Sequence, residues 1–171
     1  MHRYKIYNAP MQTTAAIAKV TTGTTIKTML QLSPPSTRQL KIVSWGFSMD
    51  AAPATTGNGL VELIQTDVGA TVTAHVASGV QPLTPGLPAS LLTLGTGNTG
   101  FTASVEGSIT ATRTFDAVQV AGVSNGGAGV EPYSYQFMPE EWCYVSASTF
   151  LRVRATFSAA VNMLTWVIWD E

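Results

Sequence analysis

The carboxyl-terminal part of this chain constrains its fold most, because it contains two consecutive segments with the pattern of β-strands. In residues 150–157, Arg152 and Arg154 fall on one face and aliphatic side chains on the other, the two-residue period of a half-buried strand. After a short turn at 158–160, residues 161–169 carry no charge and are apolar on both faces. Such a strand needs cover on both sides, which we expect from a second sheet of the same chain and from another subunit. This end of the chain predicts one compact all-β unit.

Segments with strand-like patterns recur along the whole chain, separated by Gly, Pro and Asn turn signals such as those at 33–36, 56–59 and 124–129. Many short strands with turns between them indicate a sandwich or barrel, not alternating strands and helices. The segment 88–94 follows a Pro-rich stretch, stops at Gly95 and is the one candidate for a helix. The expected strands are 3–7, 16–21, 26–32, 40–49, 59–66, 71–77, 101–105, 107–115, 117–123, 133–138, 150–156 and 161–169.

The length of the chain, 171 residues, suits one domain with a core of its own. We find no repeat of fixed period and no break in composition that would mark a linker. Residues 1–25 are rich in Thr and Ala and weakly patterned, and two interpretations stay open for them. They form either an arm that pairs with a neighbouring subunit or the first strands of the β-sandwich domain, whose main part is residues 26–171.

Charged residues make up only 11% of the chain, against about 25% in an average soluble domain. Threonine, which suits a pleated surface and discourages helix, occurs 24 times. A surface with few charges also suits burial against partners, because charged residues are depleted at the centres of interfaces. The composition therefore fits either an interface-rich protein or simply a Thr-rich β protein.

Several classes of function are disfavoured by charge and composition. The net charge is −1 and the Lys and Arg residues are scattered, so no basic stripe for nucleic acid is visible. Cys143 is the single cysteine, which excludes an intrachain disulfide and fits a reducing compartment. The start of the chain lacks the apolar region of a signal peptide, and no apolar run approaches the ~18 residues that span a bilayer. We expect a soluble protein made in a cytoplasm, with neither nucleic acid nor membrane as partner.

Few residues are available for catalysis, since a nucleophile must be held against a base. His2 lies near the start of the chain, and His75 shares a strand face with threonines and is expected to point to solvent or a polar interface. Cys143 has no base near it in sequence and is expected to be a small buried hydrophobe. Two distant histidines and one cysteine make no zinc signature, and no phosphate-binding glycine motif occurs. We expect no enzymatic activity, no cofactor and no bound metal.

Glycosidase chemistry would need two carboxylates that converge across a cleft. The candidates in strands or turns are Glu62, Glu106, Asp116 and Glu131. Spacing in an all-β chain does not establish such convergence, so we favour a structural role. Glu62 lies in a strongly apolar strand and is expected to pair with Arg113, Arg152 or Arg154 at a subunit interface.

The four tryptophans, Trp45, Trp142, Trp166 and Trp169, suit either a sugar-stacking platform or a packed core and interface. Three of the four lie in dense apolar strand surroundings, which favours the core or interface. We expect Trp166 and Trp169 to anchor packing in the last strand.

Five segments together resemble a known group of proteins. They are TGFTASVEGSITATR (99–113), YQFMPEEW (135–142), FLRVR (150–154), AVN (160–162) and VIWDE (167–171). In these segments the chain resembles small β-sandwich proteins encoded among tailed-bacteriophage head genes, that is, minor capsid, decoration or cement proteins. The resemblance covers roughly residues 40–171. It implies a jelly-roll or related sandwich that forms trimers, sits on the capsid shell without enzymatic activity and binds the major capsid protein.

The sequence therefore predicts a single-domain, antiparallel, jelly-roll-like β-sandwich. It would act as a homotrimeric accessory protein that stabilises the shell of a bacteriophage by binding its major capsid protein, and would be found in the virion. The interface residues we expect are Glu62, Arg113, Arg152, Arg154, Trp166 and Trp169. The alternatives are a carbohydrate- or receptor-binding module of a virion, or a capsid subunit with a single jelly roll.

Overall fold

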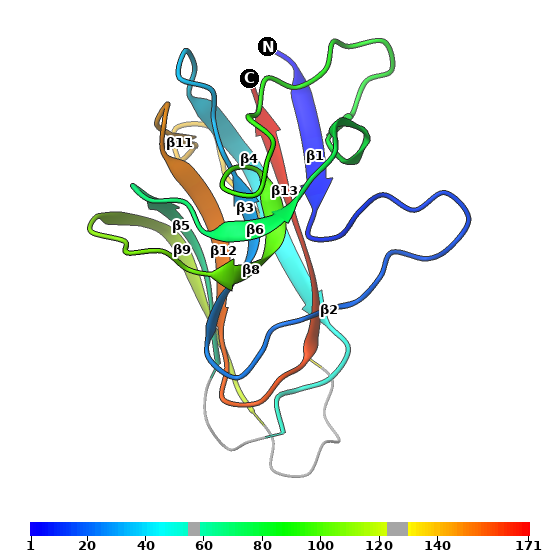
Figure 1. Cartoon of the computed structure of the whole chain (residues 1–171), viewed down its shortest axis with the longest axis vertical. Coiled ribbons are helices and arrows are strands. Elements are labelled where there is room, and N and C mark those ends of the chain that lie inside the picture. The colour runs from blue at the N-terminus through cyan, green and yellow to red at the C-terminus, as the bar shows by residue number, and fades with distance from the viewer. Residues whose placement is uncertain (55–58, 123–129) are drawn as a thin grey trace.

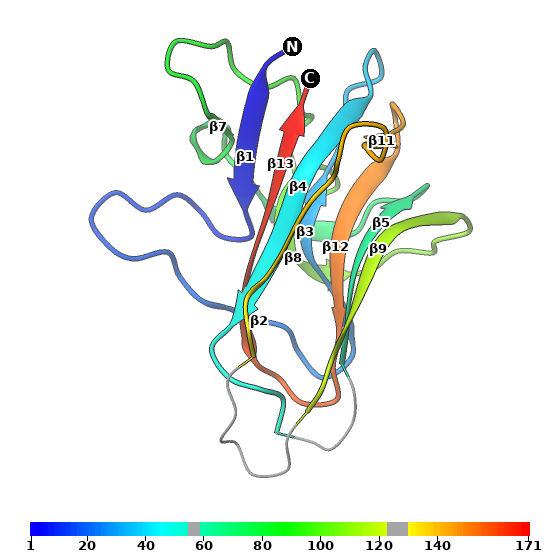
Figure 2. The same cartoon turned by 180° about the vertical axis from the view of Figure 1, so that it is seen from behind.

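The computed structural model describes residues 1–54, 59–122 and 130–171, which form two antiparallel β-sheets, A and B, packed face to face (Figures 1 and 2). From edge to edge, sheet A contains β10 (Tyr133–Gln136), β4 (Leu40–Met49), β13 (Asn162–Asp170), β1 (Arg3–Tyr7) and β7 (Gln81–Pro82), with β11 (Cys143–Val145) also on β4 and β2 (Val20–Thr21) also on β13. Sheet B contains β6 (Thr71–Ala74), β8 (Gly100–Val105), β3 (Ile26–Leu32), β12 (Phe150–Thr156), β5 (Gly59–Thr66) and β9 (Thr112–Val120).

The strands are wound as a jelly roll. The central strands of the two sheets follow the orders β10-β4-β13-β1 and β3-β12-β5-β9. Along the chain these eight strands cross from one sheet to the other at every step except from β5 to β9, so two Greek keys close around one core. The short strands β6, β7 and β8 come from the connection between β5 and β9, and extend the sheets at the edges opposite β9 and β10. The prediction of an all-β, jelly-roll-like sandwich is confirmed.

Strand β13 lies in sheet A between β1 and β4, and its side chains alternate in burial. The inward side chains are at most 1% exposed: Met163, Thr165, Val167 and Trp169. Trp169 stacks on Tyr4 of β1, with 5.7 Å between ring centroids. On the opposite face Leu164, Trp166 and Ile168 are only half-buried. Within one chain, sheet B therefore covers one face of β13, and the other face is partly open.

The bounds of five predicted strands match β1, β3, β4, β5 and β12. The two strands predicted at 107–115 and 117–123 are instead one strand, β9, with an irregular register at Phe115. The predicted strands 16–21 and 71–77 are shorter, and β7 and β11 were not predicted. Val123 and the turns predicted at 56–59 and 124–129 lie outside the described residues, apart from Gly59.

The prediction of a helix at 88–94 is wrong. The backbone N–H of Thr93 donates to the carbonyl of Ser33 at 3.0 Å, and Leu94 forms a bridge with Thr99. A segment this short makes too few internal hydrogen bonds to hold a helix against such contacts. In the described part of the chain the one helical element is a single 3₁₀ turn, Ala77–Gly79.

The N-terminal segment enters sheet A, leaves it and returns to the same edge of β13. Residues of β1 pair with β13 as far as Tyr7, and the Asn8 N–H donates to the carbonyl of Thr165 at 3.0 Å. The chain rejoins β13 at Val20, which is opposite Met163, two residues before Thr165 in β13. Residues 9–19 project from the sheet as a loop between these two points (Figure 1). Because β1 and β2 pair with the same side of β13, the two ends of this loop lie close together.

We expect the sandwich to fold without this loop. Replacing residues 10–18 by two glycines leaves strand β1 in place. The ion pair that the change disturbs is the exposed Lys19–Asp50 pair, because Lys19 directly follows the replaced residues. Thermal unfolding should then stay within about 3 °C of the parent chain. Deleting residues 1–8 is the matched comparison and should unfold the protein, because it removes Tyr4 and Ile6 from the core. Equal losses in the two variants would contradict this account of the loop.

Candidate assembly surface

Rows of side chains cross the outward face of sheet A. Tyr7, Trp166 and Gly46 are cross-strand neighbours on β1, β13 and β4, and Lys5 and Ile168 stand side by side in the next row. Tyr7 and Trp166 are thus apolar neighbours on β1 and β13, whereas the positions of β4 that face Leu164, Trp166 and Ile168 hold Ser48, Gly46 and Ser44. We call the outer aromatic face the set of Tyr7, Trp142, Tyr144, Leu164, Trp166 and Ile168, which are half-buried except for Tyr144, which is 43% exposed.

Trp166 is held against the sheet by a glycine and a lysine. A Cβ atom at Gly46 would lie 2.4 Å from Cζ2 of Trp166, so the indole occupies the space that a side chain at Gly46 would need. The Nζ atom of Lys5 lies 5.6 Å from the centroid of Trp166 and 4.7 Å from that of Tyr7. Both are within the range of cation–π attraction. The ring is therefore positioned in the single chain and keeps part of its surface open.

One carboxylate binds two cations at the end of this face. Arg3 donates from Nε and Nη2 to the two oxygens of Asp170, at 2.7 and 3.0 Å, and Lys41 Nζ lies 2.9 Å from Asp170 Oδ2. Lys41 also lies 4.0 Å from the ring centroid of Trp142. Burial alone would raise the pKa of Asp170, but the hydrogen bonds from Arg3 and Lys41 outweigh it and lower that pKa. The cluster of Arg3, Lys41 and Asp170 carries a net charge of +1, and Lys5 adds a second positive charge beside the rings.

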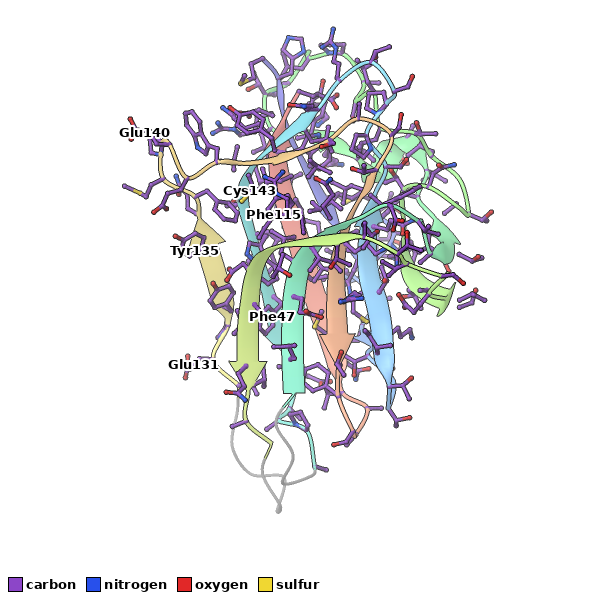
Figure 3. All side chains as sticks on the ribbon, turned by 90° about the vertical axis from the view of Figure 1, so that its left-hand side faces the viewer. Phe47, Phe115, Glu131, Tyr135, Glu140 and Cys143 are labelled. Atoms are coloured by element: carbon purple, nitrogen blue, oxygen red, sulfur yellow. The ribbon has the colours of Figure 1, made fainter. Side chains whose placement is uncertain are left out.

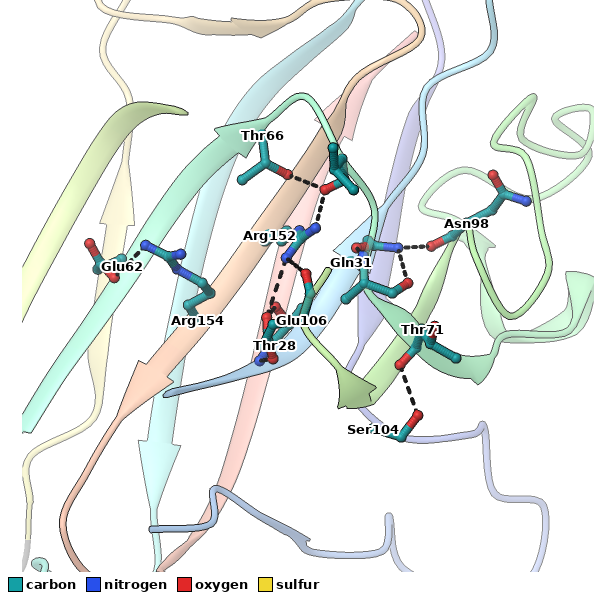
Figure 4. A network of polar contacts seen from close by, with 12 residues as sticks. Thr28, Gln31, Glu62, Thr66, Thr71, Asn98, Ser104, Glu106, Arg152 and Arg154 are labelled. Atoms are coloured by element: carbon teal, nitrogen blue, oxygen red, sulfur yellow. Dashed lines mark hydrogen bonds and ion pairs between the residues drawn. The ribbon is translucent and has the colours of Figure 1, made fainter. Parts of the chain in front are cut away.

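The predicted interface residues of sheet B make contacts within the chain (Figure 4). Arg154 and Glu62 are cross-strand neighbours, and Nη2 of Arg154 lies 3.1 Å from Oε2 of Glu62. Arg152 is fully buried and donates through Nη1 to the carbonyl oxygen of Glu106 at 3.0 Å and to its carboxylate at 3.2 Å. Its Nη2 donates to the carbonyl of Val68. Arg152 thus ties the loops after β5 and β8 to the sheet, and Arg154 joins β12 to β5.

The remaining predicted interface residues lie apart from one another. Trp169 is in the core, Trp166 is on the outer aromatic face, and Arg113 is exposed on β9 with its guanidinium 4.8 Å from the ring centroid of Phe115. A pairing of Arg113 or Arg152 with Glu62 is not seen within the chain, because Glu62 faces Arg154. Whether these residues also meet another subunit stays a prediction.

A second feature lies where the two sheets open between the edge strands β9 and β10 (Figure 3). A cavity of about 310 Å³ is lined there by Phe115, Asp116, Tyr135, Phe137, Glu141 and Cys143. Oδ2 of Asp116 accepts hydrogen bonds from Trp45 Nε1 at 3.0 Å and from the hydroxyl of Tyr133 at 2.7 Å. Burial, and next this bond to Asp116, raise the pKa of Tyr133, which keeps its hydroxyl protonated as a donor.

The expectation that His75 points to solvent or a polar interface is wrong. Its side chain is buried under Phe101, with ring centroids 4.8 Å apart, and Nε2 lies 2.8 Å from the carbonyl oxygen of Tyr7. Burial lowers the pKa of His75, with the bond to Tyr7 opposing the shift, so the ring stays neutral. His75 lies beyond β6, which ends at Ala74, so the alternation expected for a strand over 71–77 does not extend to this side chain.

Cys143 is half-buried at the cavity and not fully buried as expected. Burial raises the pKa of its thiol to about 11, so it is protonated at neutral pH and poorly suited to attack. Glu62 and Glu106 are bound to arginines, and Asp116 accepts from Trp45 and Tyr133.

Neither a metal-binding cluster nor a membrane-spanning helix is found in residues 1–54, 59–122 and 130–171. They contain no group of three or more His, Cys, Asp or Glu side chains that is placed to hold a metal ion. No helix among them has the length and apolarity needed to cross a membrane.

Comparison with known proteins adds no relative to this picture. No family model, curated protein sequence or solved structure matches the chain.

The ion network of Asp170 generates a test of how the outer face is held. Since Asp170 is nearly buried, Asp170→Asn should reduce the free energy of unfolding at pH 7 by about 2–3 kcal/mol. The pKa of Asp170 is lowered by folding, so its contribution is complete above about pH 4 and is lost as the pH falls through the folded value. Urea unfolding between pH 2 and 7 should therefore show a shallower acid loss in the variant. Parallel pH profiles for the two proteins would contradict this role.

Proposed function

We propose that this chain is a non-enzymatic structural subunit of a bacteriophage shell, which forms a homotrimer and stabilises the shell by binding its major capsid protein. The observation that carries the proposal is the outer aromatic face, a group of aromatic and aliphatic side chains that are not fully buried on β1, on β13 and in or just before β11, in a protein with few charges. Contiguous exposed apolar surface is uncommon on soluble monomers and marks interaction sites. The part of the proposal that places the protein on a phage shell rests on the sequence resemblance to phage head proteins.

The composition of the face suits association better than catalysis. Its rings are positioned before any partner arrives, by Gly46 under Trp166 and by Lys5 and Lys41 beside the rings. Less side-chain freedom is then lost on binding, and aromatic residues are enriched at the energetic centres of interfaces. Asp170 is already paired with Arg3 and Lys41, so its burial leaves no unpaired carboxylate.

Trimer formation would allow weak contacts to act together on the shell. A closed three-fold oligomer presents three copies of each contact, and avidity then exceeds the affinity of a single one. A protein that binds only the assembled shell stabilises that state by mass action. A sandwich whose surface rings are already held in position fits this role.

The self-association part is tested by the mass of the protein in solution. Multi-angle light scattering at micromolar concentration should give a mass three times that of one chain. Ile168→Glu should reduce it to that of a monomer, because it places a charge in the outer aromatic face. Leu60→Glu is the matched control, since Leu60 is 36% exposed on β5 in the other sheet, and should leave the trimer intact. A parent protein that is monomeric, or an Ile168→Glu variant that stays trimeric, would contradict the proposal.

The shell part needs a separate experiment. The purified protein should co-sediment with phage shells that lack it and should raise the temperature at which they disassemble. Absence of binding by a trimer of normal mass would remove the shell from the proposal and leave the association intact.

A second candidate is a capsid subunit with a single jelly roll, which the observed strand winding favours. This candidate predicts closed shells from the purified protein alone, seen by negative-stain electron microscopy. A discrete trimer under the same conditions favours the accessory role.

A further inference from the structure

We propose that the open edge between β9 and β10 is a second binding site, which takes an extended basic segment of a partner protein and seats a lysine or arginine side chain in the aromatic cavity. This site is separate from the outer aromatic face and does not depend on the oligomeric state. We call it the edge cleft, defined by the cavity residues Phe115, Asp116, Tyr135, Phe137, Glu141 and Cys143.

The walls of the edge cleft are aromatic and partly open. Tyr135 is 37% exposed and meets Phe137 edge to face, with 5.0 Å between ring centroids. Phe115 is half-buried on the opposite strand, at the position where the register of β9 against β5 is irregular. Such bulges re-aim side chains and are frequent beside binding sites. The volume of about 310 Å³ is at the low end of the range for ligand pockets, about 300–1,000 Å³.

The carboxylates without an ion-pair partner gather at this edge. All charged residues lie in the described ranges, where ion pairs engage Asp50, Glu62, Glu106 and Asp170. Six carboxylates remain outside those pairs: Asp67, Asp116, Glu131, Glu140, Glu141 and Glu171. Four of these six lie between Asp116 and Glu141, on or next to the two edge strands (Figure 3). This edge is therefore acidic in a chain whose net charge is only −1.

The combination of rings and carboxylates selects a cation. Aromatic faces attract ammonium and guanidinium groups, and carboxylates form the strongest hydrogen bonds with them. The chain already contains one example, because the guanidinium of Arg113 lies 4.8 Å from the ring centroid of Phe115. A saccharide fits less well, since the hydroxyl groups of Tyr133 and Tyr135 already donate to Asp116 and Glu141 and leave few donors for sugar oxygens.

The backbone around the edge cleft favours an extended partner. Each sheet ends here, sheet A with β10 and sheet B with β9. Edge strands present unpaired N–H and C=O groups, to which an extended segment adds as a further strand. Alternate side chains of that strand would then point into the cavity.

The test uses an acetylated and amidated peptide of alternating threonine and arginine, with a second peptide that carries citrulline in place of arginine. Calorimetry measures affinity, and the NMR signal of Trp45 Nε1–H, which donates to Asp116, reports binding at the site. The arginine peptide should bind saturably, shift this signal and bind more weakly as salt is added. The citrulline peptide should not bind.

Two isosteric variants locate the site. Glu141→Gln should lower the affinity for the arginine peptide by about fivefold, which is the effect of losing one exposed ion pair. Glu171→Gln makes the same change of charge outside the edge cleft and should leave affinity within about twofold. Arg113→Ala removes the cation already at Phe115 and should tighten binding. None of these variants should change the oligomeric mass, so this proposal and the trimer fail or succeed separately.

Several results would overturn the proposal. One is equal binding of the citrulline peptide, and another is no saturable binding below millimolar concentration. Weaker binding of the arginine peptide to Arg113→Ala is a third, because removal of a competing cation should strengthen it. A shift of the Trp45 signal by oligosaccharides such as maltohexaose, and not by the arginine peptide, would make the edge cleft a sugar site instead.

Discussion

The pairing of β13 with β1 on one side and β4 on the other is the constraint on which the rest of this structure depends. It joins the two ends of the chain in the middle of sheet A and sets which side chains face the core. Because successive residues alternate, burial of Val167 and Trp169 against sheet B forces Trp166 and Ile168 outward. The same alternation that closes the core thus creates the outer aromatic face.

The two proposed sites divide the work of the sandwich between its face and its edge. The outer aromatic face presents mainly half-buried aromatic and aliphatic side chains, with Asp170 paired to Arg3 and Lys41 at its end, which suits a second copy of the chain. The edge cleft is aromatic with unpaired carboxylates, which suits a basic segment of a different protein. The buried Arg152, bound to Glu106 and the carbonyl of Val68, holds the loops after β5 and β8 on sheet B.

The sequence predicts much of the fold, but it predicts less of how the residues of the two proposed sites come together. Strand-like apolar runs between turn signals located β3, β4, β5 and β12, because those strands are long and bury most of their side chains. Proximity of Arg3, Lys41 and Asp170 was not foreseeable, since it depends on which strands become neighbours. The extra residue at Phe115 hid the continuity of β9, and the end of β6 at Ala74 removed the alternation that was expected at His75.

The central claim is that another copy of the chain covers the outward side of the last strand. Hydroxyl-radical footprinting of the purified protein at two concentrations tests it directly, because oxidation reports the solvent exposure of individual indoles. The account predicts that Trp166 is protected nearly as well as the buried Trp169 at high concentration, and becomes reactive on dilution below the association range. Reactivity of Trp166 that is high and independent of concentration, with Trp169 protected throughout, would contradict it.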